Sequence, residues 1–187
     1  MKSYLNQNNL TRGVRNNNPG NIERSSSAWV GKIPYPQSKD SRFEQFTFLE
    51  YGIRALFITL RTYRNKHGLK TINGIVNRFA PSNENNTSSY MDFLSQELNL
   101  ERNATIPDTK QYRFALAKAI IQMEIGINNQ LQYVTDESIK KGYDLAYGGN
   151  TTIEELTSGV STPQSSKMGN LLTILLLTAI TIFAIKI

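Results

Sequence analysis

The central part of the chain has the apolar spacing of amphipathic helices. A stripe of apolar residues at three- and four-residue intervals begins at Leu49 and predicts a helix that ends near His67 and Gly68. Asp108 is the expected N-cap of a later helix that ends at Gly126. In all, the pattern predicts five helices, which start at Leu49, cover residues 71–79, start at Thr87 or Ser88, run from Asp108 to Gly126, and cover residues 136–147.

The pattern is different ahead of Leu49. Residues 28–48 carry Pro34 and Pro36 and end in an alternating run of Phe43, Gln45, Phe46 and Phe48. Alternation with a period of two predicts a small hairpin or β-lobe rather than a helix. The expected fold class is therefore mainly α, with a small β-lobe near the N-terminus.

The last part of the chain has another character. Residues 168–187 are almost entirely apolar on all faces and long enough, as a helix, for the hydrocarbon core of a bilayer. We expect a transmembrane anchor there, in preference to a buried helix. Residues 148–167 are rich in Gly, Ser and Thr and predict a linker, in which "TIEELT" forms one helical turn. The expected organisation is a 1–11 arm, a 12–147 domain, a 148–167 linker and a 168–187 anchor.

Composition limits the chemistry. The 187 residues include 0 Cys and 1 His, so disulfides, thiolate metal sites and multi-histidine sites are excluded, and we expect no metal or cofactor. His67 lies at a helix end, where a solvated imidazole is the ordinary state. The net charge of +6 suits nucleic acid, lipid headgroups or an acidic cell-wall polymer. Scattered Lys and Arg favour a solvated basic surface over a nucleic-acid face, and the start "MKSYLNQNNL" does not resemble a signal peptide.

Four carboxyls near the middle of the chain remain as candidates for chemistry: Glu23, Glu44, Glu50 and Glu84. Glu50 follows Thr47 by three residues, which fits a capping box. It also lies among aromatic residues, where a carboxyl can stay protonated and act as a general acid. Glu84 precedes a predicted helix, where capping is its structural interpretation. The spacing leaves both interpretations of Glu50 open.

The stretch "RGVRNNNPGNIE" places four asparagines around one turn. Pro19 and Gly20 suit the two central positions of a tight turn. The asparagines either shape the backbone or line a polar site that binds a substrate.

Four blocks, in order, resemble a family of phage virion proteins: "RGVRNNNPGNIE", "WVG", "FEQFTFLEYGIRAL" and "RFAPSNENNTSSY". The resemblance covers residues 12–126. It implies a lysozyme-like fold and a muralytic, lytic-transglycosylase activity. The chain is also similar, more distantly, to flagellar-type N-acetylglucosaminidases. Their catalytic glutamate precedes the asparagine turn, whereas residues 1–12 here contain no acidic residue.

The resemblance therefore implies that the acid lies elsewhere or that catalysis is lost. Glu50 is the first candidate acid, followed by Glu84 and Glu23. Tyr51 and Tyr90 are candidates for orienting the acid. The candidates for contact with the sugars are Asn18, Asn21 and Trp29.

The expected function is cleavage of the β-1,4 bond between N-acetylmuramic acid and N-acetylglucosamine during phage genome entry. The expected partners are peptidoglycan, the bilayer of the virion or host, and other virion proteins. Two alternatives stay open. One is a non-enzymatic virion protein at a vertex or at the link between capsid and membrane. The other is a membrane-tethered DNA-binding protein, which depends only on the basic charge.

Overall fold

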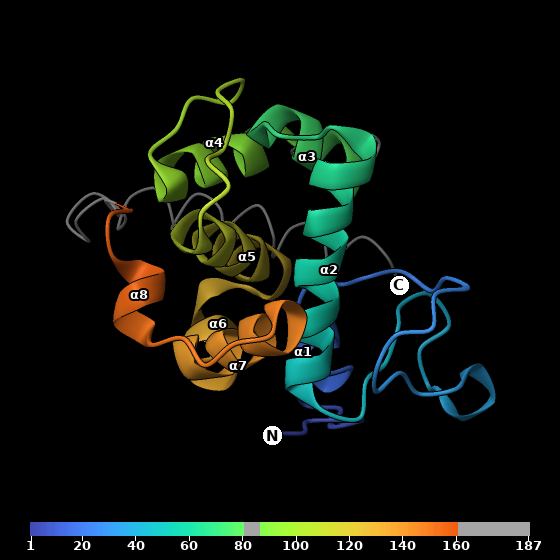
Figure 1. The fold of residues 1–187 in the computed structure, drawn as a ribbon. Coiled ribbons are helices and arrows are strands. Elements are labelled where there is room, and N and C mark those ends of the chain that lie inside the picture. Colours follow the sequence, from blue (N-terminus) through green and yellow to red (C-terminus); the bar gives the residue numbers. More distant parts are fainter. Residues whose placement is uncertain (81–86, 161–187) are drawn as a thin grey trace.

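The computed structural model describes residues 1–80 and 87–160, and its core lies between helices α2, α5 and α7 and their neighbours. Figure 1 shows α5 surrounded by the other helices, with α3 and α4 at one end and α6, α7 and α8 at the other. In the described part of the chain, the helical elements are α1 (Arg12–Arg15), the 3-10 turn η1 (Tyr35–Gln37), α2 (Leu49–His67), α3 (Ile72–Phe79), α4 (Thr87–Leu98), α5 (Lys110–Ile125), α6 (Ile127–Tyr133), α7 (Asp136–Tyr147) and α8 (Ile153–Thr157).

The core forms where α2 packs along α7 and where α5 contacts α4, α6, α7 and α8. Ile53, Leu56 and Ile120 are fully or almost fully buried in one continuous apolar cluster. Gly142 lets α7 approach α2 closely, since a Cβ there would lie 2.7 Å from the Cβ of Ile53. The helical stripes thus bury their apolar faces against each other, as the spacing predicts.

Polar residues at the helix ends satisfy free backbone groups. The hydroxyl of Thr71 accepts the Gly74 N–H at the start of α3. Gly68 adopts φ 66° at the end of α2, a left-handed conformation that suits glycine. The prediction that Asp108 caps α5 is wrong, because the hydroxyl of Thr109 accepts the Tyr112 N–H.

The expected β-lobe is not formed. In the described residues near the N-terminus, the backbone makes only isolated bridges, between Glu23 and Phe43 and between Lys32 and Phe46. Residues 16–48 instead follow an irregular path beside α2, visible in blue in Figure 1. Burial does not alternate in this run either, since Glu44, Gln45 and Phe46 are buried in succession and Phe48 is exposed.

Asparagine side chains explain why this region needs no strand pairing. The amide nitrogen of Asn17 donates to the Phe46 carbonyl at 2.9 Å, and that of Asn18 donates to the Glu44 carbonyl at 3.0 Å. The Phe46 N–H in turn donates to the Asn16 carbonyl at 3.0 Å. Because these backbone groups already have partners, a second strand has nothing to add.

The predicted turn at "TIEELT" is confirmed as α8. Thr152 and Glu155 form a capping box, and Leu156 is buried where α8 packs against α5. The predicted anchor at residues 168–187 lies outside the described residues. Within the described ranges, no helix has the length and apolar character needed to cross a membrane.

Candidate active site

Two polar side chains from distant parts of the chain, those of Asn21 and Tyr90, contact the carboxylate of Glu124. This glutamate lies near the C-terminal end of α5 and is half-buried. The amide nitrogen of Asn21 donates to its Oε2 at 2.9 Å, and the hydroxyl of Tyr90 on α4 donates to its Oε1 at 3.1 Å. We call Asn21, Tyr90 and Glu124 the Glu124 cluster.

The tight turn after α1 places Asn21. The Asn18 N–H donates to the Gly13 carbonyl and the Asn21 N–H donates to the Asn18 carbonyl, each at 2.9 Å. Asn21 has φ 45°, a left-handed conformation that asparagine tolerates better than most residues. Gly13 allows the close approach of this turn to α5, because a Cβ there would lie 2.6 Å from Cγ2 of Ile125.

The hydroxyl of the buried Tyr90 donates a hydrogen bond to Glu124 from the core side. Its side chain is buried, and burial, followed by the negative charge of Glu124 and the hydrogen bond to it, raises the pKa of the hydroxyl well above its ordinary value. Tyr90 therefore stays protonated at neutral pH and donates to the carboxylate. The predicted role of Tyr90 beside an acid thus has a matching geometry, although the acid it contacts is Glu124.

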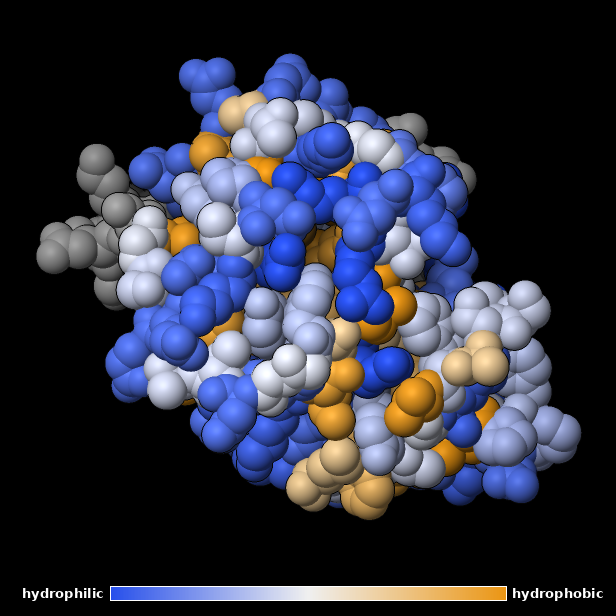
Figure 2. All heavy atoms as spheres, in the orientation of Figure 1, coloured by the Kyte–Doolittle hydropathy of each residue, from blue (hydrophilic) through white to orange (hydrophobic). Residues whose placement is uncertain are grey.

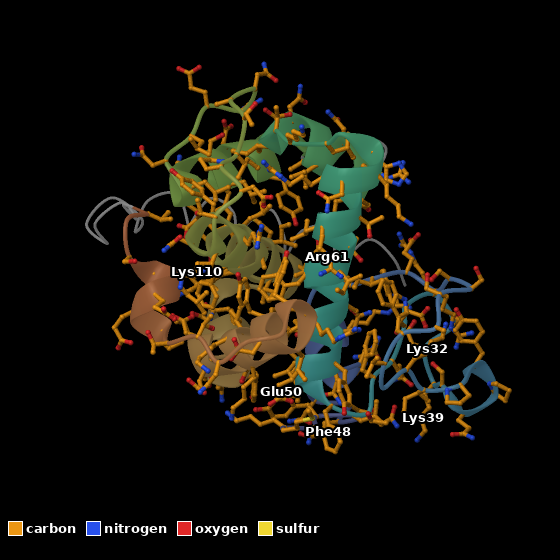
Figure 3. The ribbon with its side chains drawn as sticks, in the orientation of Figure 1. Lys32, Lys39, Phe48, Glu50, Arg61 and Lys110 are labelled. Carbon is orange, nitrogen blue, oxygen red and sulfur yellow. The ribbon has the colours of Figure 1, made fainter. Side chains whose placement is uncertain are left out.

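Glu50 lies in a different place. It belongs to the first turn of α2, beside Phe48 (Figure 3), and is 1% exposed. Both carboxylate oxygens accept the backbone N–H of Lys2, at 3.1 and 3.0 Å. The capping-box interpretation is wrong, since the N-cap of α2 is Phe48 and no side chain caps that end. Glu50 fastens the N-terminal arm to the domain.

Of the other two predicted acids, only Glu23 lies within the described residues, and it does not belong to the Glu124 cluster. Glu23 is exposed and pairs with Arg42 at 2.9 Å. Glu84 lies outside the described residues. Glu50 and Glu23 thus bind other partners, which are the Lys2 N–H and Arg42.

Glu44, also weighed from the sequence, is fully buried in an ionic cluster. Its Oε1 accepts Lys32 Nζ at 2.8 Å, the Ser25 N–H at 2.9 Å and the Tyr35 hydroxyl at 3.1 Å. Burial alone would lower the pKa of Lys32, but the Glu44 carboxylate and the Tyr35 hydroxyl raise it above its ordinary value. This cluster braces the irregular region ahead of α2.

The predicted sugar-binding residues divide into two groups. Asn21 belongs to the Glu124 cluster, whereas Asn18 is completely buried and binds the backbone of Ile22 and Glu44. Tyr51 packs its ring on Gly31, where any Cβ would overlap the ring, and Gly31 has φ 73°. Trp29 is half-buried, and its indole nitrogen is buried without a hydrogen-bond partner among the described residues.

Sequence reasoning missed Glu124, although its position carries a signal. It stands in "IIQMEIG", where Met123 and Ile125 flank the carboxyl just before Gly126. A carboxyl in an apolar run at a helix end is expensive to bury, so it is a candidate for function. Only the fold shows that Asn21 and Tyr90 reach it.

The chain has a relative among known phage proteins. No protein-family model matches the chain. The chain is 40% identical over 145 residues to "Protein P5" of Pseudoalteromonas phage PM2. The alignment covers 76% of this chain and 86% of that protein.

Proposed function

The chain belongs to the family of protein P5 of Pseudoalteromonas phage PM2, and on this premise we propose that it is a virion-associated enzyme that cleaves the glycan strands of peptidoglycan. The bond attacked is the β-1,4 bond between N-acetylmuramic acid and N-acetylglucosamine. Glu124 is the proposed catalytic acid, in place of Glu50, Glu84 and Glu23.

One observation carries the proposal. Asn21 and Tyr90 belong to two of the blocks that resemble muralytic phage proteins, "RGVRNNNPGNIE" and "RFAPSNENNTSSY". They lie 103 and 34 residues from Glu124 in the sequence, yet each sends one donor to its carboxylate. A partly exposed carboxyl held on both oxygens by neutral donors is an arrangement that suits proton transfer.

The proposed reaction needs two proton transfers. The Glu124 carboxyl first protonates the glycosidic oxygen, and the bond from that oxygen to C1 of the muramoyl sugar breaks. The carboxylate then removes the proton from the 6-hydroxyl of the same sugar, whose oxygen bonds to C1. The products are an anhydro-muramoyl end and a free 4-hydroxyl, so the glutamate ends in its starting form.

The two donors have separate uses in this scheme. Both stabilise the carboxylate, which is the form that Glu124 takes after the first transfer. Tyr90 holds Oε1 and cannot itself give up its proton near neutral pH, because of its raised pKa. Asn21 holds Oε2 and also donates to the Glu124 carbonyl, so it orients the acid.

A lytic transglycosylase needs one carboxyl, whereas a glycoside hydrolase ordinarily needs two at a defined separation. Among the candidate carboxyls in the described residues, both oxygens of Glu50 accept the Lys2 N–H, and Oε1 of the buried Glu44 is bonded to Lys32. Glu23 forms an exposed ion pair with Arg42. Within the described residues, no second candidate carboxyl joins the Glu124 cluster, and this favours the transglycosylase in our proposal.

The test is digestion of purified Gram-negative murein sacculi by the full chain. We expect soluble muropeptides with anhydro ends, identified by mass spectrometry. Glu124→Gln removes the acid and is expected to lower the rate at least about a hundredfold, the typical contribution of general acid catalysis. Tyr90→Phe is expected to lower it less.

Glu23→Gln is the matched control, because it neutralises an exposed carboxyl outside the Glu124 cluster and leaves the core intact. Thermal melts of each variant separate a loss of catalysis from a loss of fold. If Glu124→Gln is as active as the wild type, Glu124 is not the acid. If the folded wild-type chain releases nothing, the chain is a non-enzymatic phage protein.

A further inference from the structure

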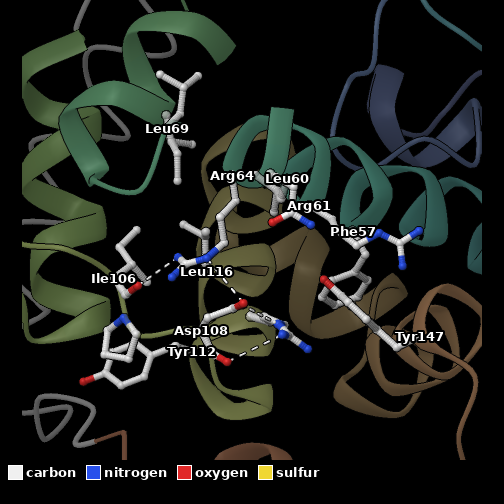
Figure 4. A pocket seen from close by; sticks show the side chains of 14 residues that line it. Phe57, Leu60, Arg61, Arg64, Leu69, Ile106, Asp108, Tyr112, Leu116 and Tyr147 are labelled. Atoms are coloured by element: carbon white, nitrogen blue, oxygen red, sulfur yellow. Dashed lines mark hydrogen bonds and ion pairs between the residues drawn. The ribbon is translucent and has the colours of Figure 1, made fainter. Parts of the chain in front are cut away.

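A cavity of about 70 Å³ lies between α2, α5 and α7 and shares no lining residue with the Glu124 cluster. A water molecule needs about 10–15 Å³ by the same measure, so the cavity admits a group of several heavy atoms. Leu60, Leu69 and Leu116 contribute its apolar wall (Figure 4). Figure 2 shows a hollow on this face with hydrophobic residues at its floor and hydrophilic residues around it.

The charged residues of the cavity do not balance. Arg61 and Arg64 reach it from α2 and Arg113 reaches it from α5, whereas Asp108 is the only acidic residue among the described residues that line it. Three positive charges and one negative charge leave an excess of two positive charges around the cavity. The Arg113 hydrogen bond, which outweighs burial, lowers the pKa of Asp108, so this carboxyl carries the negative charge counted here at neutral pH. Asp108 also lies 3.4 Å from Arg64 Nε, so the two excess charges are shared among the three arginines.

The guanidinium groups are held in place. Arg64 Nη1 donates to the Ile106 carbonyl at 2.9 Å, and Arg61 Nη1 donates to the Ala146 carbonyl at 3.2 Å. Arg113 binds Asp108 at 2.8 Å and lies 4.7 Å from the centre of the Tyr147 ring. Each guanidinium carries five N–H donors, so these contacts fix Arg61 and Arg64 and leave donors for a ligand.

We propose that this cavity, the arginine pocket, binds a compact oxyanion, phosphate or carboxylate, that is attached to a small apolar or aromatic group. The arginines supply charge and paired donors that match either oxyanion. The apolar wall supplies burial for the attached group. A neutral ligand of the same shape leaves the excess charge without a partner, so the negative group determines the binding.

Isothermal titration calorimetry of the full chain tests this with phenyl phosphate, benzoate, inorganic phosphate and neutral benzyl alcohol as probes. We expect phenyl phosphate or benzoate to bind more tightly than benzyl alcohol and than inorganic phosphate. The ranking of phenyl phosphate against benzoate tells which oxyanion the pocket prefers. Added salt is expected to weaken the binding.

Arg61→Gln is expected to weaken binding about tenfold, the loss typical of one hydrogen bond to a charged group. Arg54→Gln is the matched control: Arg54 also lies on α2 and donates to a carbonyl of α7, that of Leu145, at 3.1 Å, but it does not line the cavity. Arg54→Gln should therefore bind as the wild type does. The proposal is overturned if neither anionic aromatic probe binds, if benzyl alcohol binds equally well, or if both variants behave alike.

Discussion

Asp40 is the most heavily bonded carboxylate of the N-terminal region, and its neutralisation should destabilise the fold. The Arg12 guanidinium binds both of its oxygens, at 2.7 and 2.8 Å, and the Asn16 amide donates at 2.7 Å. The backbone N–H groups of Arg42 and Phe43 donate at 3.0 and 2.9 Å. Asp40 is 7% exposed, so these donors depend on the carboxylate rather than on water.

The size of the effect follows from those contacts. Removing one partner of a buried ion pair typically costs about 3–5 kcal/mol. Arg12 is 41% exposed and also lies over the Phe43 ring, so it keeps some solvation after the change. We therefore expect Asp40→Asn to lower the free energy of unfolding by about 3 kcal/mol at pH 7, the low end of that range. For a chain of this length, that corresponds to a fall in Tm of about 6–12 °C.

Urea unfolding of the full chain, followed by circular dichroism, measures this loss. Asp92→Asn is the control, because Asp92 pairs with Arg102 but is 54% exposed. An exposed pair contributes about 0–1 kcal/mol, so the control should change little. Equal losses in the two variants would refute the reasoning.

The pH dependence gives a second test of Asp40. Burial opposes ionisation, but the Arg12 guanidinium and the backbone and Asn16 donors hold the pKa of Asp40 far below its ordinary value. The stabilisation is therefore complete above the unfolded-state pKa of about 3.9 and is lost as the pH falls further. The difference between the wild type and Asp40→Asn should stay constant from pH 7 to about pH 5 and shrink only below about pH 4.

Two further changes test the core and the Glu124 cluster. Gly142→Ala forces α7 away from Ile53, and we expect the free energy of unfolding to fall by about 1–2 kcal/mol in urea titrations, net of the gain in helix propensity. Gly74→Ala in α3 is the control and should change the free energy of unfolding by less than about 1 kcal/mol. Burial and then Glu124 raise the pKa of Tyr90 in the folded chain, so as the pH rises through about 10 this tyrosine ionises first in the unfolded chain, and the wild type loses stability. Tyr90→Phe should reduce this loss of stability above pH 10. Tyr90→Phe is tested by comparing the urea midpoints of the wild type and the variant between pH 9 and pH 11.

The helices could be predicted because their signals are local. The stripe that begins at Leu49 and the stop at Gly68 match α2 at both ends, and Thr71 caps α3 where the pattern begins. An apolar stripe at helical spacing and a glycine in the left-handed conformation depend only on neighbouring residues. The N-cap of α5 was displaced by one residue because Asp108 and Thr109 are both good caps, and ion pairs with Arg64 and Arg113 occupy Asp108.

The β-lobe was mispredicted because periodicity does not show what the backbone groups of a run bind. The run from Phe43 to Phe48 buries both Gln45 and Phe46 and exposes Phe48, which is not the burial that an alternating pattern requires. Some of its backbone groups are bonded to Asn16, Asn17 and Asn18, which are far away in the sequence. Others pair with the backbone of Ile22, Gly31 and Ile33. Nothing in the run itself reveals partners of that kind.

The asparagine turn links the fold to the proposed catalysis. Its buried members fix the path of the chain, and its last member, Asn21, donates to Glu124 at 2.9 Å. A glycine at position 52 completes this link, because any Cβ there would overlap the carbonyl of Asn17 and push the turn off α2. The turn is therefore held at both ends, by the close contact of Asn17 with α2 and by the hydrogen bond of Asn21 to Glu124 on α5. That double constraint is a physical reason for four asparagines around one Pro-Gly pair. Asn17 and Asn18 bond backbone carbonyls inside the domain, and Asn16 bonds the side chains of Asp40 and Gln45. Asn21 holds the partly exposed Glu124 carboxylate.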